Sequence, residues 1–136
     1  WHLLAGDISV IPSISASLAR IPAGCPVHVF LQVHGPEEHV ELTSPGDLEI
    51  HWLHGDADEG IAEAIAALAF PPGTVHAFVH GEATSVRLVR RHLVVDRGVP
   101  AERLSASGYW KRTLTDEGWR AAKAAWNAQV DSETAS

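Results

Sequence analysis

Five short apolar runs alternate along the chain with segments in which apolar residues recur at helical spacing. The runs lie at 1–5, 27–33, 49–54, 75–80 and 104–107, and each predicts a β-strand. Strands that alternate with helices favour a parallel sheet covered on both faces, because each crossover places a helix against the sheet. The predicted fold class is therefore α/β, a three-layer sandwich around a five-stranded parallel sheet.

Four helices are predicted between and after these strands. Pro12 can open the first helix and Thr115 can cap the last, in which Trp119 and Trp126 lie seven residues apart on one face. Apolar residues mark three of the helices at Ile14, Leu18 and Ile21, at Ile61, Ile65 and Leu68, and at Val86, Val89 and Leu93. The polar tail 131–136 is expected to fray, which leaves one domain over 1–130.

Ligands of parallel α/β sheets bind beyond the carboxyl ends of the strands, at the point where the strand order reverses. That rule brings four short segments of this chain to one edge of the sheet. They are 6–9, 54–56, 81–82 and 107–110. We expect the functional site along this edge.

Composition narrows the class of protein. A chain of 136 residues with 46% apolar residues suits one folded domain, and no apolar run approaches the ~20 residues of a membrane span. The single cysteine, Cys25, favours a reducing compartment, so we expect a cytoplasmic protein. No signal peptide is recognisable, and the chain begins within a predicted strand, so we expect it to be part of a longer protein.

The net charge of −7 is unevenly distributed. Residues 1–80 carry Arg20 as their one cation against ten acidic residues, whereas 81–136 carry nine Lys and Arg against seven acidic residues. This balance disfavours nucleic acid as a partner, since a nucleic-acid-binding face is basic. An anionic ligand is expected in the C-terminal half, although the asymmetry also fits ordinary solvated surfaces.

The first turn of the predicted sheet offers a candidate cofactor site at Gly6, Asp7, Ser9 and Pro12. A strand followed by a glycine turn and a helix presents free backbone N–H groups, which suit a pyrophosphate. The turn departs from the glycine-rich dinucleotide motif, because Asp7 stands where a second glycine would allow close approach of a phosphate. Asp7 fits equally well as a plain helix cap.

Two later segments offer further candidate contacts at the same edge. Gly81 and Glu82 follow the fourth strand, where a glycine lets a ligand lie against the backbone, or where they form an ordinary turn. The stretch Tyr109–Trp110–Lys111–Arg112 joins two aromatic rings to two cations, a combination that suits a flat, acidic ligand or simply a structural pair.

Other chemistries find little support in the sequence. Nine histidines invite a metal hypothesis, but His51 and His54 are three apart and point to opposite faces of a strand, so no metal site is predicted. Neither a nucleophile elbow nor a phosphate-binding Walker loop is present. No side chain is singled out as catalytic.

Several motifs together resemble the siderophore-interacting proteins, which are FAD-dependent ferric-siderophore reductases of the ferredoxin-reductase-like superfamily. The similarity extends over essentially the whole chain. Its motifs are Leu-Ala-Gly-Asp with Pro12, Trp-Leu-His at 52–54, Gly-Glu-Ala at 81–83, Leu-Ser-Ala-Ser-Gly-Tyr-Trp-Lys at 104–111, Glu-Gly-Trp at 117–119 and Trp-Asn at 126–127.

The resemblance implies a ferredoxin-reductase-like NAD(P)-binding domain that works with an N-terminal FAD-binding barrel outside this chain. The implied reaction is hydride transfer from NAD(P)H to FAD, followed by electron transfer to Fe(III) in a siderophore and release of Fe(II). The chain alone is expected to be inactive and without flavin. Basic residues that would favour NADPH over NADH are missing after the second and third strands, although Arg87 or Arg90 could reach in.

The resemblance also implies roles for the candidate residues. The segment 6–12 and Gly81–Glu82 would bound the nicotinamide cleft, and Tyr109 and Trp110 would lie towards the flavin. Lys111 and Arg112 would contact the anionic ferric siderophore. Two alternatives remain, namely a reductase module of another flavoprotein and a non-catalytic α/β binding domain.

Overall fold

Five parallel strands form one sheet in the order β3-β2-β1-β4-β5, in a computed structural model that describes residues 1–134. The strands are β1 (His2–Asp7), β2 (Pro26–Val33), β3 (Asp47–His54), β4 (His76–Glu82) and β5 (Leu104–Trp110). The helices are α1 (Ile11–Leu18), α2 (Gly60–Ala67), α3 (Ala83–Arg91) and α4 (Asp116–Thr134). The predicted α/β class and five-stranded parallel sheet are confirmed.

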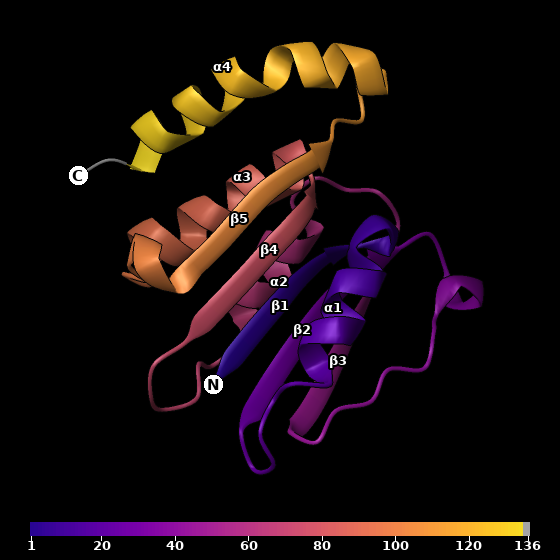
Figure 1. Cartoon of the computed structure of the whole chain (residues 1–136), viewed down its shortest axis with the longest axis vertical. Helices are drawn as coiled ribbons and strands as arrows, with labels where there is room; N and C mark the ends of the chain where they lie inside the picture. The colour runs from indigo at the N-terminus through magenta and orange to yellow at the C-terminus, as the bar shows by residue number, and fades with distance from the viewer. Residues whose placement is uncertain (135–136) are drawn as a thin grey trace.

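Two apolar cores hold the layers together. Helix α1 covers one face of the sheet, while α2 and α3 cover the other (Figure 1). Side chains alternate between the faces, so Leu4 packs in the core with α1 whereas Leu3 and Ala5 pack in the core with α2 and α3. Eight of the nine predicted helix positions are buried, namely Ile14, Leu18, Ile21, Ile61, Ile65, Val86, Val89 and Leu93. The ninth, Leu68, lies after the end of α2 and is only half-buried.

The last helix packs at the β5 edge of the sheet, beside α3 (Figure 1). The Trp119 indole Nε1–H donates to the Gly108 carbonyl at 3.2 Å, and the Trp119 and Trp126 rings meet edge to face at 5.4 Å. A Cβ on Gly108 would lie 2.9 Å from the Trp119 ring, so glycine is needed for this close packing. The prediction that both tryptophans face the same side is confirmed.

Helix α4 also continues further than the sequence pattern indicated. Residues 131–134, predicted to belong to a frayed tail, are helical, while 135–136 lie outside the described residues. The Arg87 guanidinium pairs with Glu133 at 2.8 Å, and Arg90 donates to the Val130 carbonyl at 3.0 Å. These contacts with α3 hold the last turn, and they direct both arginines towards α4.

Strands β4 and β5 extend beyond the apolar runs that predicted them. The predicted strands ended at His80 and Ser107, but β4 reaches Glu82 and β5 reaches Trp110. Gly81 pairs with Gly108 and Glu82 pairs with Trp110, with a register shift between Gly81 and Glu82. Backbone pairing continues through these residues whatever their side chains, so hydrophobicity alone underestimated both strands.

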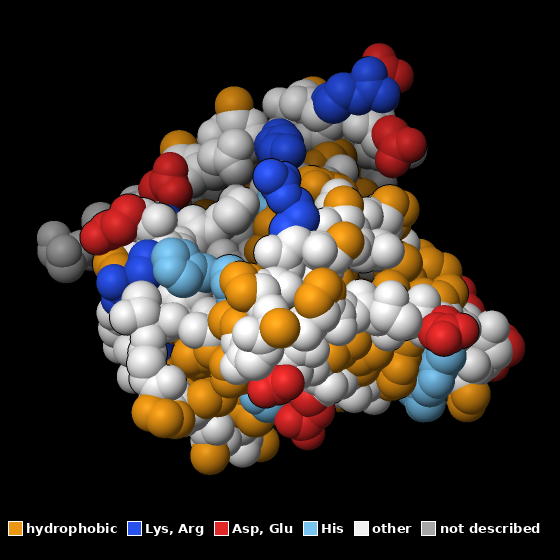
Figure 2. Space-filling model, turned by 60° about the horizontal axis from the view of Figure 1, so that its bottom comes forward, with side chains coloured by type: hydrophobic (Ala, Val, Ile, Leu, Met, Phe, Trp, Pro, Cys, Tyr) orange, Lys and Arg blue, Asp and Glu red, His pale blue; other side chains and the backbone are white. Residues whose placement is uncertain are grey.

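Charged side chains of both signs are interspersed on the face seen in Figure 2. Lys and Arg lie in its upper and left parts with acidic side chains beside them, and further acidic side chains lie in the lower and right parts. Among the described residues, no helix is both long enough and apolar enough to cross a membrane.

The close approach of the end of β1 to Val10 and to the neighbouring strand β4 depends on Gly6. A Cβ at Gly6 would lie 2.1 Å from Val10 Cγ2 and 2.5 Å from the His80 carbonyl oxygen. We predict that Gly6→Ala lowers the free energy of unfolding by at least about 3 kcal/mol, because backbone and core must both move. Urea denaturation followed by circular dichroism measures this loss.

Gly24→Ala is the matched control. Gly24 has φ of +81° but open space around its Cβ position, so only the backbone conformation opposes the substitution. The control should lose about 1–2 kcal/mol. Equal losses in the two variants would contradict the close-packing explanation for Gly6.

Candidate functional site

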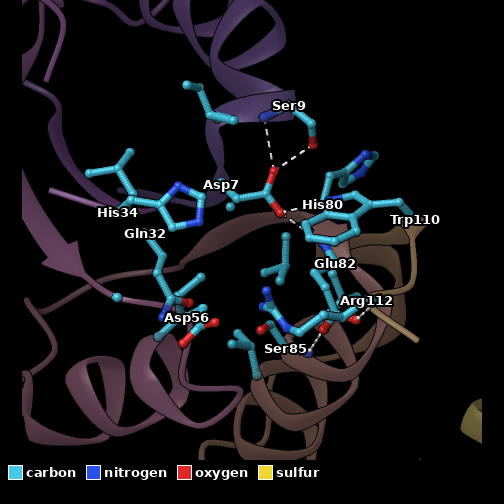
Figure 3. A pocket seen from close by; sticks show the side chains of 18 of the residues that line it. Asp7, Ser9, Gln32, His34, Asp56, His80, Glu82, Ser85, Trp110 and Arg112 are labelled. Atoms are coloured by element: carbon cyan, nitrogen blue, oxygen red, sulfur yellow. Dashed lines mark hydrogen bonds between the residues drawn. The ribbon is translucent and has the colours of Figure 1, made fainter. Parts of the chain in front are cut away.

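A cleft lies where the carboxyl ends of β1, β2 and β4 meet, next to the reversal of strand order between β1 and β4 (Figure 3). Its apolar wall comes from Val79 on β4, from Ile61 on α2, and from Val86 and Val89 on α3. Its polar side chains come from segments far apart in the sequence and include Asp7, Gln32, His34, Asp56, Glu82 and Arg112. The cleft therefore lies at the edge that the sequence predicted.

The Asp7 carboxylate lies between three of these segments. Its Oδ1 accepts hydrogen bonds from the backbone N–H of Ser9 at 2.9 Å and from the Ser9 hydroxyl. Its Oδ2 accepts from the backbone N–H of Glu82 and from the Trp110 indole Nε1–H, both at 3.0 Å (Figure 3). One side chain at the end of β1 thus joins the first turn to β4 and to β5.

The close approach of Asp7 to β4 explains the glycine at position 81. Gly81 has φ of +133°, and a Cβ there would lie 2.7 Å from Asp7 Oδ2. Any larger residue would therefore be strained in its backbone and would displace the carboxylate. Gly81 therefore leaves space for the Asp7 carboxylate against β4. It is not among the residues that line the cleft.

Glu82 forms a second, fully buried carboxylate cap. Its side chain is 3% exposed and accepts from the backbone N–H of Ser85 in the first turn of α3 and from the backbone N–H of Arg112, each at 3.1 Å. A carboxylate is stabilised at a helix N-terminus by the free N–H groups and the helix dipole. Glu82 therefore fastens the segment after β5 to the start of α3.

The Asp7 cap shows that the first turn has fewer free backbone N–H groups than the sequence predicted. The Ser9 N–H, predicted to be free for a pyrophosphate, already donates to Asp7. Asp7 is the N-cap of a single 3-10 turn, Ile8–Val10, that precedes α1. Of the two interpretations of Asp7 that the sequence left open, the structure contains the helix cap.

The segment after β5 supplies a guanidinium to the cleft. The Arg112 guanidinium carbon lies 5.4 Å from the centre of the Trp110 ring, and its Nε lies 3.7 Å from Asp58 Oδ1. Both Trp110 and Arg112 line the cleft. An exposed ion pair such as Arg112–Asp58 contributes little free energy, so an anionic ligand can compete for this guanidinium.

The structure brings together some of the predicted site residues and separates others. Those that line the cleft are Gly6, Asp7, Ser9, Glu82, Trp110 and Arg112. Pro12 lies in the first turn of α1, and Tyr109, Lys111 and Gly81 are also absent from the lining. Arg87 and Arg90 do not reach in, because they bind the end of α4.

Tyr109 belongs to a hydrogen-bonded group that reaches the cleft through His80, which is one of the lining residues. The ring is 41% exposed, and its hydroxyl lies 2.9 Å from Nδ1 of His80, whose Nε2 lies 2.8 Å from the Ser105 hydroxyl. Burial lowers the pKa of His80, and the Lys123 ammonium lowers it further. His80 is therefore a neutral hydrogen-bonding link between β4 and β5 at pH 7.

Sequence reasoning missed several polar residues of the cleft. Gln32 is 8% exposed and donates to the Ala57 carbonyl at 2.9 Å, and Ser85 is 5% exposed and contacts the Asp58 carbonyl. The signal for Gln32 was present, since it is the one amide in the apolar run 27–33. Ser85 carries no comparable signal, because a serine in the first turn of a helix is common.

We predict that Asp7→Asn lowers the free energy of unfolding by about 2–4 kcal/mol. A carboxamide has one acceptor oxygen, so in either orientation its NH2 group faces N–H donors that the carboxylate now accepts. Chemical denaturation measures the loss.

The control for this prediction is Asp56→Asn, an exposed acid of the same cleft, which should change stability by less than about 0.5 kcal/mol. If Asp7→Asn were as mild as this control, the carboxylate would not be holding the three segments together.

Known proteins with similar sequences show which family this chain belongs to. The profile of the family described as siderophore-interacting protein matches residues 1–113. Ferric vibriobactin reductase ViuB of Vibrio cholerae is 35% identical over 124 residues, covering 88% of this chain and 46% of the relative. An uncharacterized protein of Mycobacterium tuberculosis is 40% identical over 134 residues, covering 88% of this chain and 47% of the relative.

Two solved structures with a similar fold also come from siderophore-related proteins. The siderophore-interacting protein SipS from Aeromonas hydrophila superposes with a TM-score of 0.83 at 25% identity, covering 93% of this chain and 52% of that one. A siderophore utilization protein from T. fusca superposes with a TM-score of 0.73 at 29% identity, covering 85% and 46%. The chain spans about half the length of the curated relatives it matches.

Proposed function

Since this chain belongs to the siderophore-interacting protein family, we propose that it is the nicotinamide-nucleotide-binding part of an FAD-dependent ferric-siderophore reductase. The observation that carries the proposal is the cleft at the strand-order reversal, where the Trp110 ring and the Arg112 guanidinium lie together. That position is where parallel α/β sheets bind nucleotides.

The residues of the cleft fit NAD(P)H in part. An apolar wall with a neighbouring indole suits a flat ring, and Arg112 suits a phosphate. The first turn does not suit the pyrophosphate, because Asp7 already accepts from Ser9 N–H and adds a negative charge. In this proposal Arg112 therefore replaces the first turn as the anchor of the nucleotide.

When bound, NAD(P)H supplies a hydride to FAD, and the two electrons reduce two equivalents of Fe(III)-siderophore to Fe(II). This chain holds the nucleotide side of that reaction. Asp7 keeps the Trp110 indole in place through its Nε1–H, and Glu82 keeps the backbone of Arg112 against α3. Both contacts limit how far the ring and the guanidinium can move.

The partners of the cleft are also part of the proposal. FAD would be held by a domain outside this chain, which fits the half-length match to the relatives. Lys111 follows β5 outside the cleft, and we keep it as the contact for an anionic ferric siderophore, with Tyr109 on the flavin side. The cytoplasmic location stays a prediction.

The test uses the longer protein that contains this chain, with FAD bound. Arg112→Gln should raise KM for NADH or NADPH about tenfold or more, because a hydrogen bond to a charged group contributes about 1.5–3 kcal/mol. The FAD content should be unchanged. Nucleotide oxidation and Fe(II) trapped by a chromogenic chelator are measured with a ferric siderophore present.

Arg91→Gln is the matched control, since Arg91 is exposed on α3 and the change in charge is the same. Its KM should equal that of the wild type. A wild-type protein that bound no flavin and oxidised no NAD(P)H would contradict the proposal and favour a binding domain. Activity only with acceptors other than ferric siderophores would favour another flavoprotein reductase.

A further inference from the structure

Three side chains that can bind a metal converge far from the cleft, near the amino ends of two neighbouring strands. His28 lies on β2, and Glu49 and His51 lie on the edge strand β3. His28 Nδ1 is 3.1 Å from His51 Nε2 and 3.4 Å from Glu49 Oε2, and His51 Nε2 is 3.9 Å from Glu49 Oε1. A tetrahedral Zn²⁺ site with ligand bonds near 2.1 Å separates its ligand atoms by about 3.3–3.6 Å.

The strand register explains why these residues meet. Glu49 and His51 are two apart, so their side chains share one face of β3. Glu49 pairs with His28 and His51 pairs with Phe30, and His28 and Phe30 share the corresponding face of β2. The convergence is therefore built by regular strand pairing and needs no unusual loop.

Neighbouring aromatic rings hold both imidazoles in place. The Phe30 ring stacks on His51 at 4.3 Å, and the Trp1 ring meets His28 edge to face at 5.6 Å. The side chain of His28 is 12% exposed, that of His51 is 27% exposed and that of Glu49 is 64% exposed. The group thus has two oriented imidazoles that are mostly covered and one carboxylate that is open to solvent.

Hydrogen bonds alone cannot satisfy all three contacts within this group, whereas one bound metal ion could contact all three side chains. Each of the two facing ring nitrogens carries at most one proton, so at most two of the three contacts can be hydrogen bonds.

We propose that His28, Glu49 and His51 bind a divalent transition-metal ion such as Zn²⁺, with a fourth coordination position open to solvent. Two imidazoles and one carboxylate are typical of transition-metal sites, whereas Mg²⁺ and Ca²⁺ prefer oxygen ligands. The ion joins β3 to β2 by side chains as well as by backbone pairing, so it stabilises an edge of the sheet. The sequence pointed away from a metal because it paired His51 with His54, which lies on the other face.

A second histidine pair provides an internal comparison. His39 Nε2 and His54 Nε2 lie 2.7 Å apart, and the His39 ring stacks on Trp52 at 4.3 Å. This pair is not among the groups of three or more ligand residues found in the described part of the chain. A substitution there tests whether any adjacent histidines suffice for binding.

The test is calorimetric titration of the chelator-treated 136-residue chain with Zn²⁺ at pH 7, and with Mg²⁺ as the hard-cation control. The wild type should bind one Zn²⁺ per chain with a measurable rise in Tm, and Mg²⁺ should give neither effect. Glu49→Gln and His51→Gln should each weaken Zn²⁺ binding by more than about tenfold, since even outer-shell partners of metal sites cost about 10–100-fold. His39→Gln should bind as the wild type does.

Three results would overturn the proposal. They are the absence of saturable Zn²⁺ binding to the wild type, unchanged affinity in both Glu49→Gln and His51→Gln, and loss of binding in His39→Gln instead. Glu49 is largely exposed, so the Glu49→Gln variant should fold and can be tested even if His51→Gln is unstable. None of these results depends on reductase activity, so the metal site and the proposed function fail separately.

Discussion

The hydrogen bonds of the Asp7 carboxylate are the constraint on which the cleft depends. Four donors meet its two oxygens, and they come from the first turn, from the end of β4 and from β5. Residues separated by up to 103 positions in the sequence are thereby held within one hydrogen-bonded group. Gly6 and Gly81 permit the backbone approaches that this group needs, because a Cβ at either position would overlap its neighbours.

The electrostatics of the cleft follow from the same constraint. Asp7 caps the first turn and Glu82 caps α3, so at both helix starts a carboxylate of the protein accepts a backbone N–H that could otherwise bind a phosphate. An anionic ligand is left with the Arg112 guanidinium, which the Glu82 bond and the Trp110 ring position at the rim. Among the described residues that line the cleft, Arg112 is the one Lys or Arg, and it lies with the acidic residues Asp7, Glu38, Asp56 and Glu82.

The sequence predicted the fold well because the fold rests on periodicity. Short apolar runs placed all five strands, and helical spacing placed Ile14, Ile65 and Val89 in the cores where they lie. The topological rule for parallel sheets then located the cleft. The strand ends at Glu82 and Trp110 were missed because backbone pairing, not hydrophobicity, extends a strand through polar residues.

Side-chain partners were much less predictable than elements. The use of Arg87 and Arg90 to hold α4, and of Asp7 to accept from Trp110, depends on contacts between residues distant in sequence. The meeting of His28 with Glu49 and His51 depends on the register of β2 against β3. A single sequence shows which faces are apolar, but it does not show the offset between two strands that pair through a crossover.

A double-mutant cycle between Asp7→Ala and Trp110→Phe tests the central claim most directly. Trp110→Phe keeps an aromatic ring but removes the indole N–H that donates to Asp7 Oδ2. If the carboxylate holds β5 to β1, the two changes in unfolding free energy should be non-additive, with a coupling of about 1–3 kcal/mol. Additivity within about 0.5 kcal/mol would contradict the account, because it would mean that Asp7 and Trp110 stabilise the protein independently.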